Sequence, residues 1–265
     1  RVAFKWKLKP VHSLAASYGL HSRRERLDYY FVEQEINGVT QNNKYLDFSK
    51  AHHFGLTYDW KMNQNLHLKI EPYYQYLFNI PVEKNTSYSI INEGSVYIDK
   101  LLKNDGTGIN YGIEMTLEQY IKNGFYYMVT GSVFKSKYKG GDHIWRGTRL
   151  DKGYMFNLLG GKEWMIGKHK QNVFSLNARI FFHGGNRFTP VDEKKTEEVK
   201  EVILDEANAF SKKFNPAFNG DFSASYRINK RKVSHEFSLK ILNVGAKTGM
   251  HYYEYNEKEG HINKV

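Results

Sequence analysis

The sequence predicts an all-β protein, an antiparallel up-and-down transmembrane β-barrel of which this chain supplies about ten strands. Three observations carry this prediction. Long segments alternate apolar with polar residues, their connections are short and long in turn, and an aromatic residue stands just before each of the last four short connections.

The alternation is clearest between Lys50 and Phe78, where two long segments flank the short polar link 62–64. Period-two alternation is typical of strands with one apolar and one polar face, because successive side chains point to opposite sides. Each segment is about ten residues or longer, which matches the roughly 9–11 residues that a tilted strand needs to cross a bilayer. We call the alternate positions that carry apolar residues the apolar parity of a strand, and the positions between them its polar parity. The apolar parity here consists of Phe54, Leu56, Tyr58, Trp60, Leu66, Leu68, Ile70, Tyr74, Tyr76 and Phe78.

The same pattern recurs along the chain and predicts strands over 2–9, 13–21, 48–61, 65–79, 108–121, 125–137, 151–166, 171–184, 216–228 and 233–245. Asn123-Gly124 predicts a tight type I′ hairpin turn, since both central residues of that turn need positive φ. Longer polar stretches separate the hairpins, at 22–47, 80–107, 138–150 and 185–215, and residues 197–210 are expected to form a short helix in the last of them. Outer-membrane barrels have short periplasmic turns and long extracellular loops, and we expect the same orientation here.

The aromatic residues before the short turns are Trp60, Tyr120, Trp164 and Tyr226. At two or three residues from the rim they would lie at the depth of the lipid headgroups, where an amphipathic ring is stable. Tyr120 stands on the polar parity of its strand, so it can face the lipid headgroups with the other three only if the strand contains a bulge. The alternative is that all four are ordinary strand aromatics.

The polar parity carries many charged residues, among them Asp59, Lys69, Glu71 and Arg179. Unpaired charges in a dry core would each cost several kcal/mol, so the inside of the barrel must be wet or filled by a polar plug. That requirement predicts a wide barrel. The alternative is a soluble sheet whose apolar side is buried and whose polar side meets water.

Composition narrows the class of protein. The chain of 265 residues has no cysteine, which excludes disulfides, thiol nucleophiles and cysteine-ligated metals. It also lacks the run of about 18 apolar residues that a transmembrane helix requires. The net charge of +11 is spread through turns and polar strand faces. We therefore expect lipopolysaccharide or an anionic solute, and no nucleic acid, as the counter-charge.

Enzyme motifs are scarce, and we predict no catalytic residue, no cofactor and no metal site. His52 and His53 are adjacent on a strand and should point to opposite faces, which makes a poor metal site. The carboxylate pairs Glu114/Glu118 and Asp59/Glu71 suggest a glycosidase at most weakly, because many similar polar residues line the same faces.

Several stretches resemble the C-terminal barrel of a TonB-dependent outer-membrane receptor, nearer to the branch with an N-terminal carboxypeptidase-regulatory-like domain than to the starch-utilisation importers. The resemblance covers nearly the whole chain. The stretches are KAHHFGLTYDWKMNQNLHLKIEPYYQYLFNIPVE, NGFYYMVTGSVFKSKYKGGDHIWRGTR, NLLGGKEW, GGNRFTPVD and SYRINKRKVSHEFSLKILNV.

The resemblance implies a barrel of about 22 strands with a plug domain inside it, located in the cell outer membrane. It implies import of a scarce solute such as a metal chelate, a vitamin or a glycan. Expected partners are outer-membrane lipid and lipopolysaccharide, the TonB energy-coupling complex through an N-terminal region, the plug domain and a surface lipoprotein. Residues 1–265 are then one partial barrel, without plug or closing strand, that ends in the last external loop at Asn263-Lys264-Val265.

Solute contact is expected from the loops, with Trp145, Arg146, Arg149 and Arg187 as candidates, because aromatic rings suit sugars and guanidinium groups suit anionic chelates. The alternative is that these side chains pin loops together or bind lipopolysaccharide phosphates. Two rival functions stay open at this point. One is a self-contained smaller barrel of porin, adhesin or lipase type, and the other is a soluble β-sheet binding module.

Overall fold

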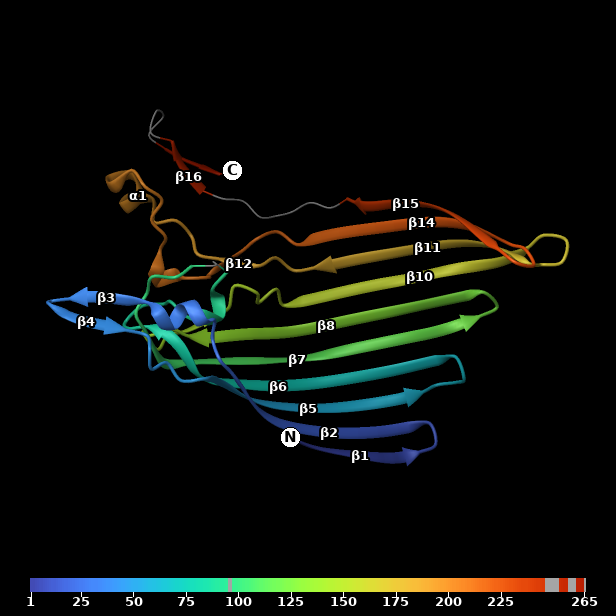
Figure 1. Ribbon diagram of the computed structural model, residues 1–265, viewed down its shortest axis with the longest axis horizontal. Helices are drawn as coiled ribbons and strands as arrows, with labels where there is room; N and C mark the ends of the chain where they lie inside the picture. Colours follow the sequence, from blue (N-terminus) through green and yellow to red (C-terminus); the bar gives the residue numbers. More distant parts are fainter. Residues whose placement is uncertain (95–96, 246–252, 257–260, 265) are drawn as a thin grey trace.

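A computed structural model of the chain describes residues 1–94, 97–245, 253–256 and 261–264. Its main feature is one antiparallel sheet in the order β1-β2-β5-β6-β7-β8-β10-β11-β14-β15, in which successive hairpins follow the chain (Figure 1). These ten strands correspond one for one to the predicted segments. Their bounds are β1 Val2–Lys9, β2 His12–Arg23, β5 Ser49–Lys61, β6 Leu66–Glu83, β7 Leu102–Lys122, β8 Phe125–Lys139, β10 Tyr154–Ile166, β11 Asn172–His183, β14 Ala217–Asn229 and β15 Ser234–Val244.

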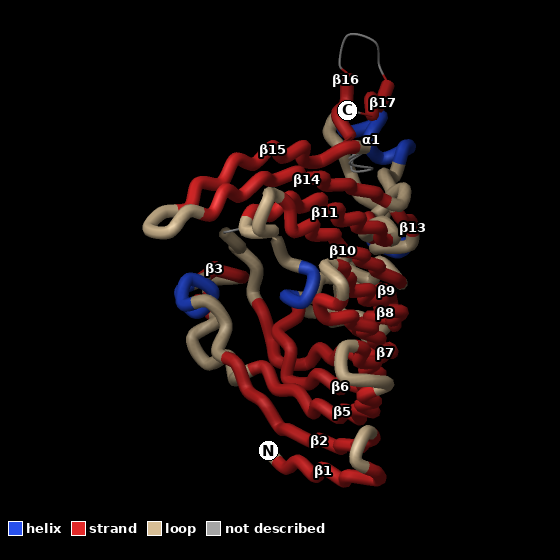
Figure 2. The backbone as a smooth tube through the Cα atoms, turned by 90° about the vertical axis from the view of Figure 1, so that its right-hand side faces the viewer, coloured by secondary structure: helices blue, strands red, loops and turns tan. Residues whose placement is uncertain are grey.

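The sheet forms an open arc (Figure 2). Strands β1 and β15 are its two edges and are not paired with each other in the described part of the chain. The tight turns that join β1 to β2, β5 to β6, β7 to β8, β10 to β11 and β14 to β15 lie at one end, which we call the turn end, and the longer connections lie at the other, which we call the loop end (Figure 1). The predicted all-β, antiparallel architecture is confirmed, and the described strands leave the sheet open.

The Asn123-Gly124 turn has the geometry that its sequence predicts. Asn123 has φ 53° and Gly124 has φ 75°, the positive values of a type I′ turn. A side chain on Gly124 would also collide with β10, since a Cβ there would lie 2.1 Å from the carbonyl oxygen of Glu163. Glycine is therefore required at this position for its conformation and for its small size.

Strands β6 and β7 extend further into the loop end than the alternation predicts. The register between them shifts between Leu77 and Ile80, where Asn79 adopts a positive φ of 55°. Beyond this bulge Val82 still pairs with Lys103. An inserted residue reverses the parity of a strand, so the alternation stops at the bulge although the strand continues.

Small elements fold within the long connections. The helix predicted over 197–210 is wrong in position. Helix α1 begins earlier because the Asp192 side chain accepts a hydrogen bond from the Lys195 backbone N–H, and it ends where Lys200 turns left-handed at φ 62°. The elements are β3 Glu33–Ile36, β4 Val39–Asn42, β9 Trp145–Gly147, β12 Arg187–Phe188, β13 Lys212–Lys213, β16 Tyr253–Asn256, β17 His261–Lys264, α1 Glu193–Val199 and the 3-10 helices η1 Leu27–Phe31, η2 Ile90–Asn92 and η3 Glu206–Asn208.

No helix in the described ranges combines the length and the apolar character that a membrane crossing would need. Of the last external loop expected up to Val265, only β16 and β17 are described, and Val265 itself lies outside the described residues.

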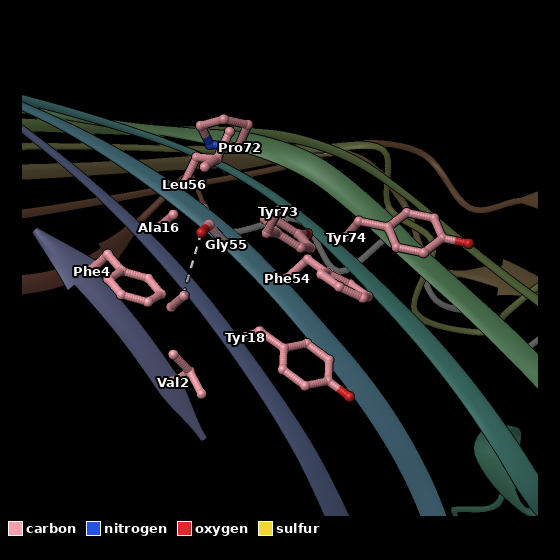
Figure 3. A pocket seen from close by; sticks show the side chains of 11 residues that line it. Val2, Phe4, Ala16, Tyr18, Phe54, Gly55, Leu56, Pro72, Tyr73 and Tyr74 are labelled. Carbon is pink, nitrogen blue, oxygen red and sulfur yellow. Dashed lines mark hydrogen bonds between the residues drawn. The ribbon is translucent and has the colours of Figure 1, made fainter.

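The apolar parity of the sheet is exposed. Ile113 is 48% exposed, Leu176 44% and Leu239 68%. Figure 3 shows this face across β1, β2, β5 and β6, where Phe4, Tyr18 and Phe54 are among the side chains that line an open groove of about 540 Å³. A soluble sheet requires these side chains to be buried, so the exposure contradicts that alternative.

The buried core lies at the loop end. It consists of Tyr29, Ile80, Ile90 and Ile98, with Leu77 and other partly buried residues packed against it. Leu77 belongs to the polar parity of β6, opposite Gly108. Figure 2 shows β3 and the helix beside it on the concave side of the arc. The polar parity therefore faces the concave side, and the loops fold over it at one end.

Candidate solute-binding site

The concave face carries linked polar side chains in its middle part. Asn110 donates to the Gln75 carbonyl oxygen at 3.1 Å and accepts from the Ser136 hydroxyl at 2.6 Å. Nearer the turn end, Glu71 accepts from Lys69 at 2.7 Å. These groups border a hollow of about 510 Å³. The predicted polar lining of this face is thus present, and several of its side chains are linked by hydrogen bonds and ion pairs.

A second hollow, of about 750 Å³, lies where the concave face meets the loops. Its polar lining is mostly basic and includes His21, Arg23, Arg24 and His53, while apolar residues of the loop core close its floor. We call these four residues the basic pocket. The side chain of Arg23 is 74% exposed although it contacts Glu25 at 3.1 Å, so it stays accessible to a solute.

The sequence builds this pocket by continuing β2 past its predicted end. Residues 21–23 stay paired with β5, which places Arg23 at the end of the sheet and Arg24 directly after it. Gly19 lies opposite His53, and a Cβ on Gly19 would fall 2.5 Å from Nε2 of His21. The missing side chain leaves room for the two imidazole rings, whose centroids are 4.5 Å apart.

The charges around the basic pocket suit an anionic ligand, because Arg23, Arg24, Arg26 and Lys50 outnumber the two carboxylates in its lining, Glu25 and Glu93. Glu25 is buried and already accepts hydrogen bonds from Arg23 and from the hydroxyl of Ser49. Arg24 and the outer part of Arg23 therefore present positive charge toward the hollow, above an apolar floor. Guanidinium groups bind carboxylate, phosphate and other planar anions through paired hydrogen bonds. A ligand with anionic groups on an apolar body fits this arrangement.

The four residues predicted to contact solute are not brought together in this pocket. Arg187 donates from Nε to Asp151 at 2.8 Å, and the Asp151 side chain is only 1% exposed. Arg146 donates to Asp142, with its own side chain 8% exposed. Arg187 thus links two separate segments of the loop end, as in the alternative that the sequence left open, whereas Arg146 forms its ion pair within the 138–150 connection. Their contact with solute stays a prediction.

Arg149 and Trp145 lie in different surroundings. The backbone N–H of Arg149 donates to Asn92 at 2.8 Å, and its guanidinium packs so closely on Gly94 that a Cβ there would lie 2.3 Å from Nη1. Trp145 pairs with Lys139 across β8 and β9, and the Lys139 ammonium sits 5.0 Å from the Trp145 ring centroid. Lys139 is an even number of residues from Val133 on β8, so both side chains point to the convex face. Trp145 lies directly opposite Lys139 and therefore points to the same face.

Asp142 belongs to the same loop junction as Arg146. Burial raises the pKa of this carboxyl, but hydrogen bonds from the Arg146 guanidinium and the Ile144 backbone N–H outweigh it, and the net shift is downward. The ionised form is therefore stabilised by the folded loop.

The four aromatic residues near the turn end divide into two groups. Trp60 and Trp164 stand on the apolar parity and stack on neighbours, with Trp164 5.7 Å from the ring centroid of Phe174. Tyr226 lies opposite Phe174 on the same face. Tyr120 instead hydrogen-bonds Glu118 on the polar parity. The register shifts between Gln119 and Lys122, so an irregularity of the expected kind is present beside Tyr120. A position at headgroup depth stays a prediction for all four.

His52 and His53 point to opposite faces, as adjacent strand residues should. His52 stacks on Phe78, at 5.1 Å between ring centroids, on the convex face. His53 belongs to the basic pocket on the concave face. Within the described ranges, no group of three or more His, Cys, Asp or Glu side chains is arranged to hold a metal ion. Asp59 contacts His67 at 3.0 Å as part of the polar lining.

Alternation located the concave face but not the basic pocket. The residues that it missed are His21, Arg23, Arg24 and His53. The run of basic residues at the end of a strand is the available signal, but the alternation fades there and predicts a loop. Joining His21 to His53 also requires the pairing of β2 with β5 across a long connection.

Comparison with known proteins identifies the fold. No protein-family model and no curated protein sequence matches the chain. Three solved structures resemble it, with TM-scores of 0.60, 0.63 and 0.61 and sequence identities of 14%, 12% and 12%. They are the ferric-catecholate import receptor Fiu of E. coli K12, FpvA of P. aeruginosa with a pyoverdine–iron complex, and the ferric preacinetobactin receptor BauA of Acinetobacter baumannii.

The likeness covers 99%, 96% and 99% of this chain and 32%, 29% and 33% of the respective structures. The chain thus spans about a third of the length of each of these proteins. All three are TonB-dependent receptors. The chain therefore has the fold of a part of the barrel of a TonB-dependent receptor.

Proposed function

We propose that this chain is part of an energy-coupled receptor that imports a scarce solute across the outer membrane through a plugged barrel. The observation that carries the proposal is the reversed polarity of the sheet, with apolar side chains exposed on the convex face and polar side chains on the concave face. Only lipid outside and water or a polar plug inside make that arrangement favourable. The likeness to three receptor structures, one of them named as an import receptor, supports the same role.

In the full-length protein, other strands close the arc into a barrel of about 22 strands. The turn end then faces the periplasm and the loop end faces outward. A plug domain fills the concave side, and the TonB complex supplies energy through an N-terminal region. A surface lipoprotein partner and a domain of the carboxypeptidase-regulatory-like kind remain part of this proposal. The protein acts as a transporter and not as an enzyme.

Among metal chelates, vitamins and glycans, we favour a metal chelate with anionic groups. The basic pocket supports this choice, because it offers arginine and histidine side chains above an apolar floor. The three similar structures bear names that refer to ferric-catecholate import, a pyoverdine–iron complex and ferric preacinetobactin. Neutral sugars would require stacking aromatics and amides, which do not dominate this pocket.

Uptake by cells that carry the full-length protein tests the function. A strain lacking the gene, and the same strain with the gene restored, would be given labelled ferric chelates, cobalamin or glycans in the presence and absence of TonB. We expect one anionic chelate to enter only when both the gene and TonB are present. Entry that needs the gene but not TonB would favour a self-contained smaller barrel of porin type.

A charge-removing pair of substitutions tests the basic pocket. Arg23→Gln with Arg24→Gln should weaken binding of the anionic chelate roughly tenfold or more, since hydrogen bonds to charged groups contribute about 1.5–3 kcal/mol each. Lys168→Gln with Lys230→Gln removes the same charge at the turn end and should leave binding within about twofold of the wild type, because those charges lie too far away for unscreened interaction. Equal binding by both variants would reject the pocket as the solute site.

A further inference from the structure

The five tight turns at the turn end carry most of the net charge of this chain. Counted from the last residue of one strand to the first of the next, they hold eight lysine and arginine residues and no aspartate or glutamate, against a net charge of +11 for the whole chain. The turn segments are 9–12, 61–66, 122–125, 166–172 and 229–234. The strand pairing brings all five turns to one end of the sheet, so most of the net positive charge is concentrated there.

Five of these eight cations lie in two neighbouring turns, which join β10 to β11 and β14 to β15 (Figure 1). Strand β11 pairs with β14, and Asn229 links the two turns directly. Its backbone N–H donates to the Asn172 side chain at 3.1 Å, and its side-chain amide donates to the Gln171 carbonyl at 2.8 Å. We call Lys168, Lys170, Lys230, Arg231 and Lys232 the basic turn cluster.

The basic turn cluster is not neutralised by ion pairs within the described residues. All five of its side chains are exposed. On the same hairpin, the Glu236 carboxylate is already paired with Arg227 at 2.8 Å. Five like charges in two adjacent turns repel one another, and an external polyanion would offset that repulsion.

The two turns place these charges beyond the level expected for the lipid headgroups. Tyr226 stands three residues before the end of β14, and Trp164 stands two residues before the end of β10. At about 3.3 Å per strand residue, the turns begin about 7–10 Å further along the strands than these rings. With the rings at headgroup depth, as the sequence predicts, the basic turn cluster lies in the aqueous space of the periplasm.

The composition of the cluster favours an extended polyanion over a folded protein as its partner. The cores of protein–protein interfaces are rich in aromatic residues and poor in lysine. The basic turn cluster has four lysines and one arginine, and segments 166–172 and 229–234 contain no Phe, Tyr or Trp. Flexible, exposed lysines suit many weak contacts with anions that repeat along a polymer.

We propose that the basic turn cluster binds peptidoglycan, the carboxylate-bearing polymer of the periplasm, through the free carboxylates of its stem peptides. These carboxylates repeat along the polymer, so several cations of the cluster pair with it at the same time. The contact holds the turn end of the barrel against the cell wall. The proposal rests on the proposed placement of the chain in the outer membrane, but not on transport.

Co-sedimentation of the purified full-length protein, in detergent, with isolated peptidoglycan sacculi tests the proposal. Replacing all five residues of the cluster by glutamine should weaken binding at least about fivefold, since one exposed ion pair changes affinity roughly 1.4-fold to fivefold. Arginine at the four lysine positions keeps the charge and should keep binding within about twofold of the wild type.

A matched control removes the same number of exposed charges at the loop end. It should bind sacculi within about twofold of the wild type, because those charges lie more than a screening length from the turns. The control substitutions are Lys44→Gln, Lys84→Gln, Lys135→Gln, Lys137→Gln and Lys194→Gln.

Further arms identify the group that is recognised. Sacculi whose carboxylates have been converted to amides should bind the wild type no better than untreated sacculi bind the glutamine variant. Phosphatidylglycerol added to the detergent should not displace the sacculi. Unchanged binding by the glutamine variant, an equal loss in the control, unchanged binding to amidated sacculi, or displacement by phosphatidylglycerol would each overturn the proposal.

Labelling in cells separates failure of this proposal from failure of the proposed placement. Lys168→Cys introduces a cysteine into a chain that has none, and a membrane-impermeant maleimide should label it only after the outer membrane has been opened. Labelling in intact cells would mean that the turn end faces outward, and the placement and the peptidoglycan contact would then both fail. Labelling only in opened cells, together with unchanged binding by the glutamine variant, would reject the peptidoglycan contact alone.

Discussion

The strands and the loop end of this molecule follow opposite rules for their apolar residues. On the convex face of the strands, Phe237 is 65% and Leu239 68% exposed. At the loop end, Tyr29 is 4% and Ile80 3% exposed. The loop end is therefore built like a small water-soluble protein, with a core and buried polar contacts, whereas the strand region has no core of its own.

The difference shows which medium stabilises each region. The loop end buries apolar side chains against one another, and Asp151, almost fully buried, joins strand β8 to the 185–215 connection through the Ser136 N–H and the Arg187 guanidinium. In the strands, the backbone N–H and carbonyl groups are satisfied by hydrogen bonds between neighbouring strands. Their apolar side chains stay exposed on the convex face, where an apolar medium such as the bilayer interior would solvate them. Each prediction below changes one region and leaves the other as its reference.

The largest effect is expected at the buried carboxylate of the loop end. Asp151→Ala should lower the free energy of unfolding by about 3–5 kcal/mol, because it leaves Arg187 partly buried without its partner. Hydrogen exchange of the 138–150 and 185–215 connections would measure it. Asp28→Ala removes an exposed partner of Arg26 and should cost about 1 kcal/mol or less. Equal costs for the two variants would mean that the loop end has no specific interior.

Charge on the convex face tests the strand region. Leu158→Arg, in the middle of β10, should destabilise the protein in lipid vesicles by about 2–4 kcal/mol. Thr130→Arg places the same side chain on the concave face and should cost less than about 1 kcal/mol, since that face is wet. Urea unfolding of the full-length protein in vesicles measures both. A reversed order would mean that the lipid-facing side has been assigned incorrectly.

A smaller effect, confined to one loop, follows from Asp142. Hydrogen bonding to Arg146 and Ile144 outweighs burial and holds the pKa of this carboxyl below its ordinary value of 3.8. A depressed pKa means that the stabilisation is present above pH 3.8 and is lost as the pH falls through the lower folded value. Proteolysis at residues 140–148 should therefore speed up only in that acidic range. Asp142→Asn should remove this pH dependence, and an unchanged profile would contradict the assignment.

The smallest effect is expected from the aromatic residues near the turn end. Trp164→Ala should lower stability in vesicles by about 1 kcal/mol, because the ring loses its contact with Phe174 and with the interface. Tyr120→Ala, whose hydroxyl bonds Glu118 on the concave face, should cost less than half as much. Urea unfolding in vesicles compares the two variants, and fluorescence quenching of Trp164 by brominated lipids reports its depth. Similar costs would place both rings at the same interface.

The fold was predictable to the level of individual strands, whereas the candidate site was not. The ten long strands of the sheet and the turn at Gly124 follow from local patterns, whereas the short eleventh strand β9 does not. The bulge at Asn79 hid the ends of β6 and β7, because parity reverses there. Residue type alone predicts that the arginines contact solute, and residue type does not reveal that Arg187 already pairs with Asp151.

The sequence by itself determined which side of each strand is apolar, because the direction of a side chain on a strand depends only on its position along that strand. Only the tertiary structure decided which residues from distant parts of the chain meet at the loop end. His21 reaches His53 through strand pairing, and Phe210 packs on Tyr138 at 6.0 Å between ring centroids. Contacts between residues so far apart in the chain depend on how the whole sheet brings its loops together at one end. No local periodicity encodes that arrangement.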